Sequence, residues 1–420
     1  MKTIILCKKL FTAETDFAQE NMAVILEDNK IVDVVRRDEV GSLDSFDSVI
    51  DLSDKFVLPG LFDCHAHCAF NGSFEELSDQ YMCSSSGPKI SLLAIRNLQD
   101  DLMAGFTSIR DVGCCPDWAD IAIRDAINEG YHWGPRMSVV GLTINAVGGH
   151  GDNHLLPSYS SLGTDRVRAI ICGADQARQA ARINFKYGAD GIKFMSTYGV
   201  MTPGDDPGPQ ELTYDEMRAI VEVADFRGGY TCTHAHGLNG IKCAVRSGVT
   251  SIEHGTFIDE EAAEMMVERG TFLVPTLVVD PRMFRHMKPG EIKPNVIAKA
   301  KRCTEVHAKN IGMAYRKGVK IAFGTDVCAP YLYHGTQAEE FVYMVNEAGM
   351  KPAHALHSAT RIASELLRWD NKLGTITPGK LADIIAVPGD PLEDISVMQH
   401  VTFVMKDGKV YKNQAEEEMK

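Results

Sequence analysis

The chain has 420 residues, of which 45% are hydrophobic and 24% charged, and its formal net charge is −14. No apolar run approaches the roughly 18 residues of a membrane span, and the acidic balance excludes nucleic acid and anionic membranes as expected partners. The 11 cysteines include no CxxC pair, and MKTIILCKKLFTAE lacks the long apolar core of a signal peptide. We therefore expect a reduced, cytoplasmic protein without zinc fingers.

Both ends of the chain alternate short β-rich runs with turn signals. These runs are residues 3–6, 22–27 and 30–35 near the start, and residues 384–387 and 402–406 near the end. Such alternation is typical of a small antiparallel sheet. We expect residues 1–56 and 367–420 to form one small β-sandwich domain.

Between these ends, short apolar runs alternate with longer helical stretches, which is typical of parallel strands with crossover helices. The eight apolar runs are residues 57–62, 107–110, 137–140, 191–195, 230–233, 250–253, 271–275 and 320–323. Helical stretches lie at residues 91–103, 175–186, 214–226, 260–268 and 295–316. Because eight strands close such a barrel, we expect residues 57–366 to form an α/β domain, a (β/α)₈ TIM barrel.

A pair of histidines follows the first of these strands. His65 and His67 come directly after VLPGLFDC. Residues i and i+2 of a strand point to the same side, so both imidazoles can reach one metal ion. An isolated HxH pair is more often structural. The interpretation of this pair as metal ligands therefore depends on the ligand-type residues that come later in the chain.

Four further ligand-type residues lie at the ends of later predicted strands. They are Lys193 in DGIKF, His234 in YTCTHAHG, His254 in TSIEHG and Asp326 in IAFGTD. Taken singly, each has an ordinary reading, such as a solvated lysine or a hydrogen-bonded core histidine. Catalytic residues of such barrels converge from several strand ends, so their shared position favours an active site.

The whole series of motifs resembles a known family. FVLPGLFDCHAH, DGIKF, HAHG, SIEHG, GTD, SATRIASELL and GTITPGKLADIIAV occur in the order typical of the amidohydrolase superfamily and span nearly the whole chain. They are most similar to the imidazolonepropionase-like branch. That branch includes prolidase-like dipeptidases, lysine/arginine carboxypeptidases and ochratoxin-hydrolysing amidases.

The resemblance implies two divalent metal ions, expected to be zinc. By position it assigns His65, His67 and Asp326 to the first ion, His234 and His254 to the second, and Lys193 to both as a carboxylated lysine, its carbamate. A carbamate is an anionic two-oxygen ligand that can span a metal pair. A hydroxide bridging the metals would attack the substrate carbonyl, and Asp326 would pass a proton to the leaving nitrogen.

Three more residues are candidates for contact with substrate. His236 lies where amidase-like relatives carry histidine and the dipeptidases tyrosine, which implies a catalytic role in stabilising the oxyanion or holding the substrate. His150, in the glycine-rich VGGHGD, is expected to bind the substrate carboxylate, and Tyr198 is a weaker candidate. A structural role stays open for His150 and His236. The remaining histidines match no ligand position: His132, His154, His286, His307, His334, His354, His357 and His400.

These residues predict an enzyme that hydrolyses an amide or peptide bond. The expected substrate is a small molecule, a dipeptide or an N-acyl amino acid with a free carboxylate, and relatives indicate a homo-oligomer. One alternative is a one-metal deaminase or a cyclic-amide hydrolase of the imidazolonepropionase type. Lys193 argues against it, as does Gly237, which stands where such deaminases carry glutamate. The other is an inactive amidohydrolase-like scaffold, which the filled ligand positions disfavour.

Overall fold

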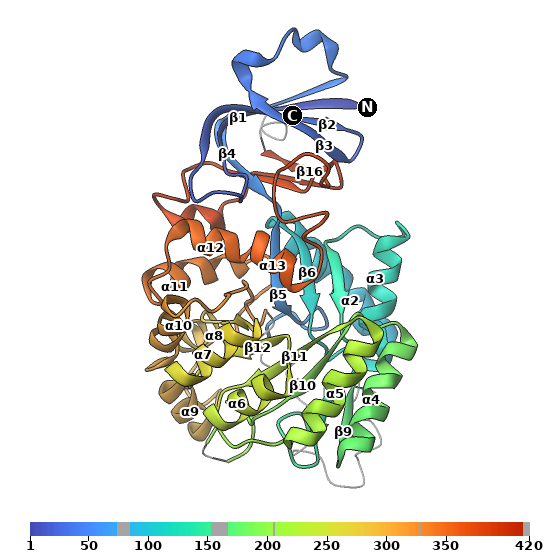
Figure 1. Ribbon diagram of the computed structural model, residues 1–420, viewed down its shortest axis with the longest axis vertical. Helices are drawn as coiled ribbons and strands as arrows, with labels where there is room; N and C mark the ends of the chain where they lie inside the picture. Colours follow the sequence, from blue (N-terminus) through green and yellow to red (C-terminus); the bar gives the residue numbers. More distant parts are fainter. Residues whose placement is uncertain (74–84, 153–166, 205, 328, 415–420) are drawn as a thin grey trace.

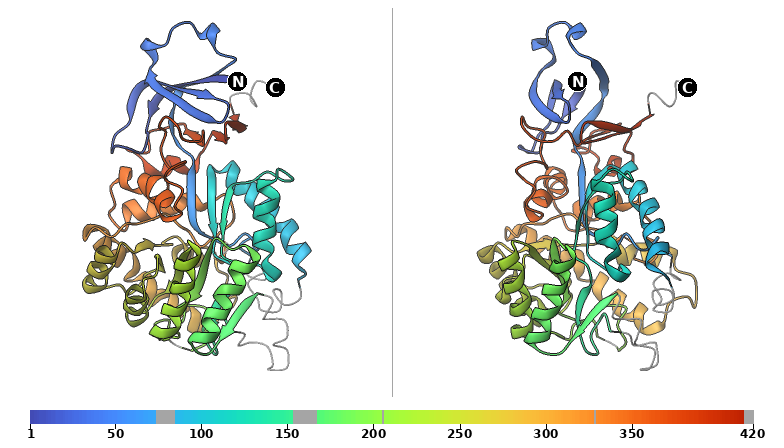
Figure 2. Two further views of the ribbon diagram at one scale, coloured as in Figure 1. Left: turned by 45° about the vertical axis from the view of Figure 1, so that its right-hand side comes forward. Right: turned by 90° about the vertical axis from the view of Figure 1, so that its right-hand side faces the viewer.

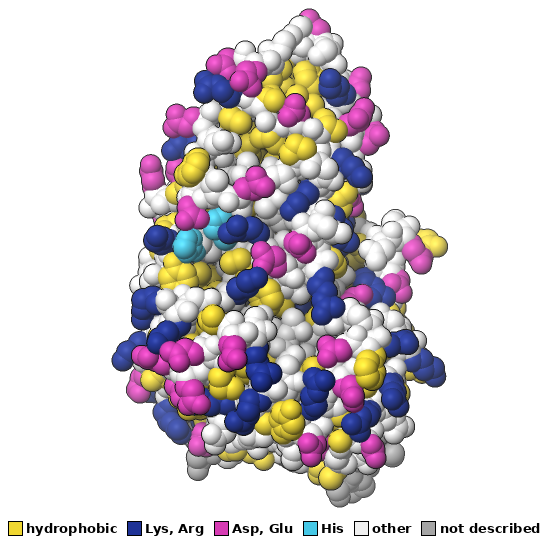
Figure 3. Space-filling view, viewed as in Figure 1, with side chains coloured by type: hydrophobic (Ala, Val, Ile, Leu, Met, Phe, Trp, Pro, Cys, Tyr) yellow, Lys and Arg dark blue, Asp and Glu magenta, His cyan; other side chains and the backbone are white. Residues whose placement is uncertain are grey.

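The computed structural model describes residues 1–73, 85–152, 167–204, 206–327 and 329–414. A β-sheet unit that includes the N-terminus lies at one end of the long axis, and a larger α/β unit forms the rest (Figure 1). Lys and Arg are interspersed with Asp and Glu over the face shown in Figure 3. Among the described residues, no helix is both long enough and apolar enough to cross a membrane.

Segments from both ends of the chain form one seven-stranded sheet, ordered β16-β15-β14-β4-β1-β2-β3. Its strands are β1 (Lys2–Leu10), β2 (Gln19–Glu27), β3 (Lys30–Arg36), β4 (Ser48–Pro59), β14 (Ile384–Val387), β15 (Phe403–Lys406) and β16 (Lys409–Asn413). The pair β1–β4 is parallel, and the other pairs are antiparallel. Alternate residues of these strands, such as Val24, Ile384 and Phe403, pack in one apolar cluster, which explains the period of two in the sequence.

The α/β unit contains two further sheets with only parallel pairs, ordered β5-β6-β7 and β13-β12-β11-β10-β8-β9. The strands are β5 (Leu61–Ala66), β6 (Phe106–Asp111), β7 (Arg136–Val139), β8 (Thr143–Ala146), β9 (Arg168–Ile171), β10 (Gly191–Met195), β11 (Tyr230–Ala235), β12 (Ser251–His254) and β13 (Phe272–Val274). Strands β10 and β11 are buried along their whole length, as expected for parallel strands with both faces covered.

Helices connect these strands and cover one side of them (Figures 1 and 2). They are α2 (Gly87–Met103), α3 (Ala119–Asn128), α4 (Ala174–Tyr187), α5 (Tyr214–Arg227), α6 (Leu238–Ser247), α7 (Glu260–Arg269), α8 (Val279–His286), α9 (Pro294–Thr304), α10 (His307–Arg316), α11 (Glu340–Asn346), α12 (Pro352–Ser358) and α13 (Arg361–Leu366). Ile192 and Phe194 pack in the cluster that includes the apolar faces of α4 and α5. In the segment 321–323, Ile321 and Phe323 belong to the same main cluster and Ala322 to a separate one, so successive residues face two different layers.

The predicted strand at residues 320–323 is not a regular strand. Ile321 forms only an isolated bridge to Leu273. The segment is nevertheless bonded on both sides, because the Leu273 amide donates to the Lys320 carbonyl at 2.9 Å and the Cys64 amide donates to the Phe323 carbonyl at 2.8 Å. Both bonds place this segment between β13 and β5.

Two other expected elements differ from the sequence prediction. The helix predicted at residues 295–316 is two helices, α9 and α10, with a break at Glu305 and Val306. The first predicted strand, residues 57–62, is divided at Gly60 between β4 of the terminal sheet and β5 of the α/β unit. A Cβ atom at Gly60 would lie 2.2 Å from Oγ1 of Thr107, so this close approach requires glycine.

Candidate metal centre

A cavity of about 530 Å³ opens in the α/β unit at the carboxyl ends of β5, β10, β11 and β12. All the predicted ligand residues line it: His65, His67, Lys193, His234, His254 and Asp326. His150 and His236 line it as well. Side chains as far apart in the sequence as residues 65 and 326 therefore line one cavity.

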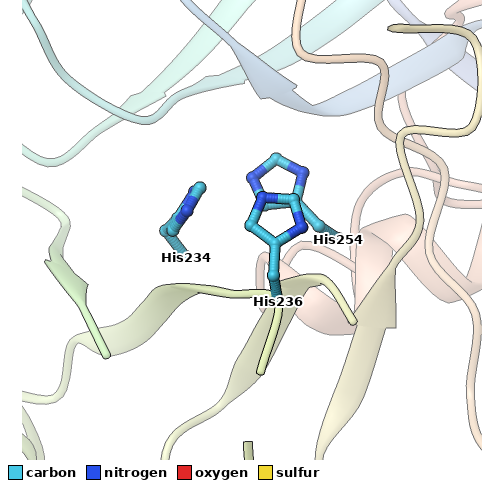
Figure 4. A group of neighbouring side chains, drawn as sticks. All are labelled: His234, His236 and His254. Atoms are coloured by element: carbon cyan, nitrogen blue, oxygen red, sulfur yellow. The ribbon is translucent and has the colours of Figure 1, made fainter. Parts of the chain in front are cut away.

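Three histidines from β11 and its continuation, and from the end of β12, form one compact group (Figure 4). Ring nitrogen atoms of His234, His236 and His254 all lie within 4.8 Å of one another. The ring centroids of His234 and His254 are 4.6 Å apart, and the His236 ring stacks on that of His254 with an angle of 3°. Figure 4 shows the three rings projecting into the same space.

A second group shares His254 with the first. Ligand atoms of His65, His254 and Asp326 lie within 4.8 Å of one another. Oδ1 of Asp326 lies 3.4 Å from Nε2 of His65 and 3.1 Å from Nε2 of His67. One carboxylate oxygen and two imidazole nitrogens thus converge on one point.

The opposite nitrogen of each ring is held by a second contact. Nδ1 of His65 lies 2.8 Å from Glu253, and Nδ1 of His67 lies 3.0 Å from the carbonyl of Gly113. Both partners only accept hydrogen bonds, so each Nδ1 carries a proton and Nε2 of each ring points into the cavity. Nδ1 of His254 is similarly fixed, 2.7 Å from Oγ1 of Thr276.

Lys193, on β10, lines the same cavity and is only 1% exposed. No hydrogen bond or ion pair to its amine is found within the described part of the chain. A buried ammonium without a counter-ion is costly, whereas a carbamate would bring an anion among the imidazoles. Neutral nitrogen donors, one carboxylate and a convertible amine form a donor set that fits divalent metal ions such as zinc.

Electrostatics favour the metal-binding form of His65, His234 and Asp326. His67 differs, because burial is outweighed by its contacts with Asp326 and Cys114, which raise its pKa well above the ordinary value, so it must lose a proton to bind a metal ion. Burial, followed by the charge of Lys193, lowers the pKa of His65 to about 4. Burial and then the neighbouring His150 lower the pKa of His234 well below its ordinary value. Burial opposes ionisation of Asp326, but the nearby His65 and His67 outweigh it and keep the pKa of Asp326 below its usual value. Neutral imidazoles and an ionised carboxylate are the ligand forms.

Two of these residues have a left-handed backbone, which non-glycine residues rarely adopt. The φ angle is 69° at His254 and 60° at Asp326. Hydrogen bonds hold both conformations, since the Asp326 amide donates to the His65 carbonyl at 2.7 Å and Nε2 of His307 donates to the His254 carbonyl at 2.9 Å. Such strain concentrates where side chains must be placed for function.

The predicted substrate residues differ in position. The ring of His150 stacks on that of His234, with centroids 4.2 Å apart, and its Nδ1 lies 2.6 Å from Oγ1 of Thr202. Tyr198 is not among the described residues that line the cavity. It reaches the site through its backbone carbonyl, 3.3 Å from Nε2 of His234.

Several ionisable residues that line the cavity are not predicted from the sequence. His307 begins α10, Arg168 begins β9, and Asp280 lies in the first turn of α8. Of these, His307 is one of the histidines that match no ligand position in the sequence. The start of a helix or strand carries no signal comparable to that of a ligand at the carboxyl end of a strand, so only the folded chain reveals these residues.

Comparison with known proteins identifies relatives along most of the chain. The sequence pattern of the amidohydrolase family matches residues 56–411. Ochratoxinase from Aspergillus niger is 33% identical over 376 residues, which cover 85% of this chain and 75% of ochratoxinase.

Solved structures agree with these sequence matches. A Xaa-Pro dipeptidase with methionine bound in its active site has a TM-score of 0.89 and 37% identity, over 98% of this chain and 100% of its own. A prolidase complexed with N-methylphosphonate-L-proline has a TM-score of 0.88 and 31% identity, over 99% of this chain and 100% of its own. The predicted relationship and enzyme class are confirmed: this chain belongs to the amidohydrolase family and is a hydrolase of amide or peptide bonds.

Proposed function

We propose that this chain is a two-metal hydrolase that cleaves the amide bond of a dipeptide or an N-acyl amino acid with a free carboxylate. One observation carries the proposal: six ligand-type residues, separated by up to 261 positions between His65 and Asp326, line a single cavity. Relatives described as Xaa-Pro dipeptidase, prolidase and ochratoxinase support a small substrate with an amide bond.

The proposal includes a closed (β/α)₈ barrel at residues 57–366, with a β-sandwich domain formed by residues 1–56 and 367–420. Hydrogen bonds between the separate sheets support closure. The Asp190 amide donates to the Val139 carbonyl at 2.8 Å, which connects β7 to the strand of Lys193. On the other side, residues 320–323 bond to both β13 and β5. A closed ring would direct the carboxyl ends of all strands to one mouth.

The resemblance assigns the metal ligands, and the two groups of side chains support that assignment in part. His65, His67 and Asp326 would hold one ion, His234 and His254 the other, and carboxylated Lys193 would bridge them. Two bound cations would lower the pKa of a coordinated water and polarise the scissile carbonyl. Zinc is the metal that this mixture of imidazole and carboxylate ligands fits best.

The residues of the chain would then move protons and stabilise charge. Asp326, ionised next to His67, would accept the proton of the attacking water and deliver it to the leaving nitrogen. Burial lowers the pKa of His236 to about 3, so its ring is neutral. Nδ1 of His236 lies 2.8 Å from the Thr256 hydroxyl. In the tautomer in which Nδ1 accepts from this hydroxyl, the Nε2–H group would be available to an oxyanion.

Two groups support recognition of a carboxylate. His150 is fixed by Thr202 at the cavity wall, and Arg168 lines the same cavity. Arginine is suited to bidentate contact with a carboxylate. We place the carboxylate of the leaving amino acid near these two side chains.

A panel of dipeptides and N-acyl amino acids, each paired with its C-terminal amide, tests the function. Wild-type protein should contain about two metal ions per chain and hydrolyse the acids, whereas Lys193→Ala should lose the bridged pair and activity together. Lys317→Ala removes an exposed lysine that pairs with Glu264 and serves as the matched control. Almost no bound metal after purification in zinc-containing medium would favour the inactive scaffold. Equal turnover of acids and amides would exclude a carboxylate requirement.

A further inference from the structure

One wall of the cavity is apolar and comes mainly from α8, α9 and the loop after β10. The apolar residues of this wall are Val200, Met201, Val279, Met283, Ile292 and Val296. Met283, Ile292 and Val296 pack together with Val200 in a cluster separate from the main core. The elements that form this wall carry none of the metal-ligand candidates, so the wall is a separate surface of the same cavity.

Hydrogen bonds fix this wall next to the candidate metal centre. Lys299 of α9 donates to the carbonyl of Thr202, and the Asn295 side chain donates to the carbonyl of Gly204 at 3.3 Å. The hydroxyl of Thr202 contacts His150, whose ring stacks on that of His234. The loop therefore connects the apolar wall to the proposed carboxylate and metal sites, and an occupant of the wall would lie beside the reacting bond.

Polar side chains also reach this part of the cavity: Lys293 and Asn295 at the start of α9, and one carboxyl group on α8. Asp280 is half-buried on α8 and lines the cavity. Its contact with protein donors is one hydrogen bond from Oγ1 of Thr304 at 3.3 Å, and no Lys, Arg or His of the described chain forms an ion pair with it. Among the described residues, the titratable groups whose pKa shifts are coupled to Asp280 by charge are Asp326 and, on α9, Cys303. Neither supplies a positive charge.

An unpaired carboxyl in apolar surroundings is unfavourable unless a partner satisfies it. Burial raises the pKa of Asp280 to about 7, which is the physical sign of that missing partner. A ligand that brings a cationic N–H donor would form a charge-assisted hydrogen bond there. In a dipeptide, the α-ammonium is two bonds from the scissile carbonyl, whereas an N-acyl amino acid has no such group.

We propose that this wall is the acyl subsite and that Asp280 is a specificity-determining residue, which binds the free amino group of an apolar N-terminal residue. The inference rests on the proposed amide hydrolysis and narrows it to unblocked dipeptides. The apolar residues would hold the first side chain, and Asp280 would hold the ammonium. Blocked or deaminated acyl groups would leave the carboxyl unpaired.

Matched substrates test this subsite. For one leaving amino acid, kcat/KM is measured for the leucyl dipeptide and for its 4-methylpentanoyl analogue, which lacks only the amino group. Wild-type protein should prefer the leucyl substrate by roughly 10- to 100-fold, the usual effect of a hydrogen bond to a charged group. Asp280→Asn should bring the two substrates to nearly equal kcat/KM, and Asp280→Glu should restore part of the preference.

A second pair of variants tests the apolar wall. Met283→Ala removes a cavity-lining side chain and should lower kcat/KM for the leucyl substrate more than for the glycyl substrate. Met287→Ala alters the same apolar cluster but not a cavity-lining residue, so it should leave the leucyl-to-glycyl ratio unchanged. Metal content and thermal unfolding of each variant separate loss of the subsite from loss of the fold.

The possible outcomes separate failure of the role of Asp280 from failure of the proposed function. Equal turnover of the leucyl and 4-methylpentanoyl substrates by wild-type protein would overturn the role of Asp280, while amide hydrolysis itself would stand. Hydrolysis of neither substrate, together with an inactive wider panel, would instead contradict the proposed function. A preference that Asp280→Asn does not reduce would assign amino-group recognition to another residue and would equally overturn the inference.

Discussion

Nδ1 of His65 lies 2.8 Å from Oε2 of Glu253, and both side chains are buried. The other carboxylate oxygen, Oε1, accepts hydrogen bonds from Arg110 at 2.8 Å and from the hydroxyl of Ser251 at 2.6 Å. Burial would raise the pKa of Glu253, but the Arg110 guanidinium outweighs burial and lowers that pKa to about 2. An ionised Glu253 keeps the proton of His65 on Nδ1 and leaves Nε2 available to a metal ion.

Glu253→Gln should therefore weaken metal binding without emptying the cavity of ligands. The amide lacks the charge that fixes the His65 tautomer, and loss of such a partner typically costs about 10- to 100-fold in metal affinity. Competition with a chelator measures the change. Glu264→Gln, at an exposed residue paired with Lys317, provides the control. Unchanged metal affinity in Glu253→Gln would show that the Glu253 charge is dispensable.

Carboxylation of Lys193 predicts that metal loading depends on carbon dioxide. The buried amine must lose a proton and gain a carboxylate before it can bridge two cations. Metal-free protein reloaded with zinc in carbon dioxide-depleted buffer should regain activity slowly, and added bicarbonate should accelerate recovery. Lys193→Ala should show no response to bicarbonate. Equally fast recovery of wild-type protein with and without bicarbonate would contradict the carbamate.

The sequence predicts much of this site because its ligand candidates follow a repeated local pattern. Lys193 and His254 each lie on a short buried strand that the apolar run reveals, and parallel strands direct their carboxyl ends to one edge. The terminal sheet is also indicated by the sequence, since apolar and polar residues alternate at both chain ends, as in strands that cover one apolar cluster.

Other features depend on tertiary contacts that have no local pattern. Asp280 and His307 lie on helices whose distance from the metal ligands is decided by long connections. The break between α9 and α10 occurs within a continuous helix-forming sequence. Residues 320–323 read as a strand but bond to neighbours through an irregular backbone.

Gly199→Ala should disrupt the histidine group by steric conflict alone. A Cβ atom at this position would lie 2.6 Å from Cε1 of His150 and 2.8 Å from Nε2 of His234. His150 is held by Thr202, so the rings cannot both move away without losing contacts. We expect a loss of at least about 100-fold in kcat/KM, in line with the effect of small displacements in an active site.

A matched glycine substitution provides the control for Gly199. Gly41→Ala introduces a Cβ atom with nothing within 4 Å, so activity and thermal stability should remain at wild-type levels. Metal stoichiometry shows whether Gly199→Ala acts by displacing His234. Wild-type activity in Gly199→Ala would mean that the two rings are not required in the positions described.

Asp280→Asn should stabilise the protein at alkaline pH, since a residue that serves binding can be unfavourable for folding. Burial raises the pKa of Asp280 from 3.8 to about 7, so the folded chain holds this proton more tightly than the unfolded chain. At low pH the carboxyl is protonated in both the folded and the unfolded chain, so it does not change the free energy of unfolding. It becomes destabilising as pH rises through this window and is fully so above about 7. For a half-buried group we expect a gain on the order of 2 kcal/mol in the variant above pH ~7, and almost none at pH ~4. Thermal unfolding across this pH range measures the difference, and Asp370→Asn, at an exposed residue, is the control. A gain in stability that does not change with pH would contradict the burial of an unpaired carboxyl.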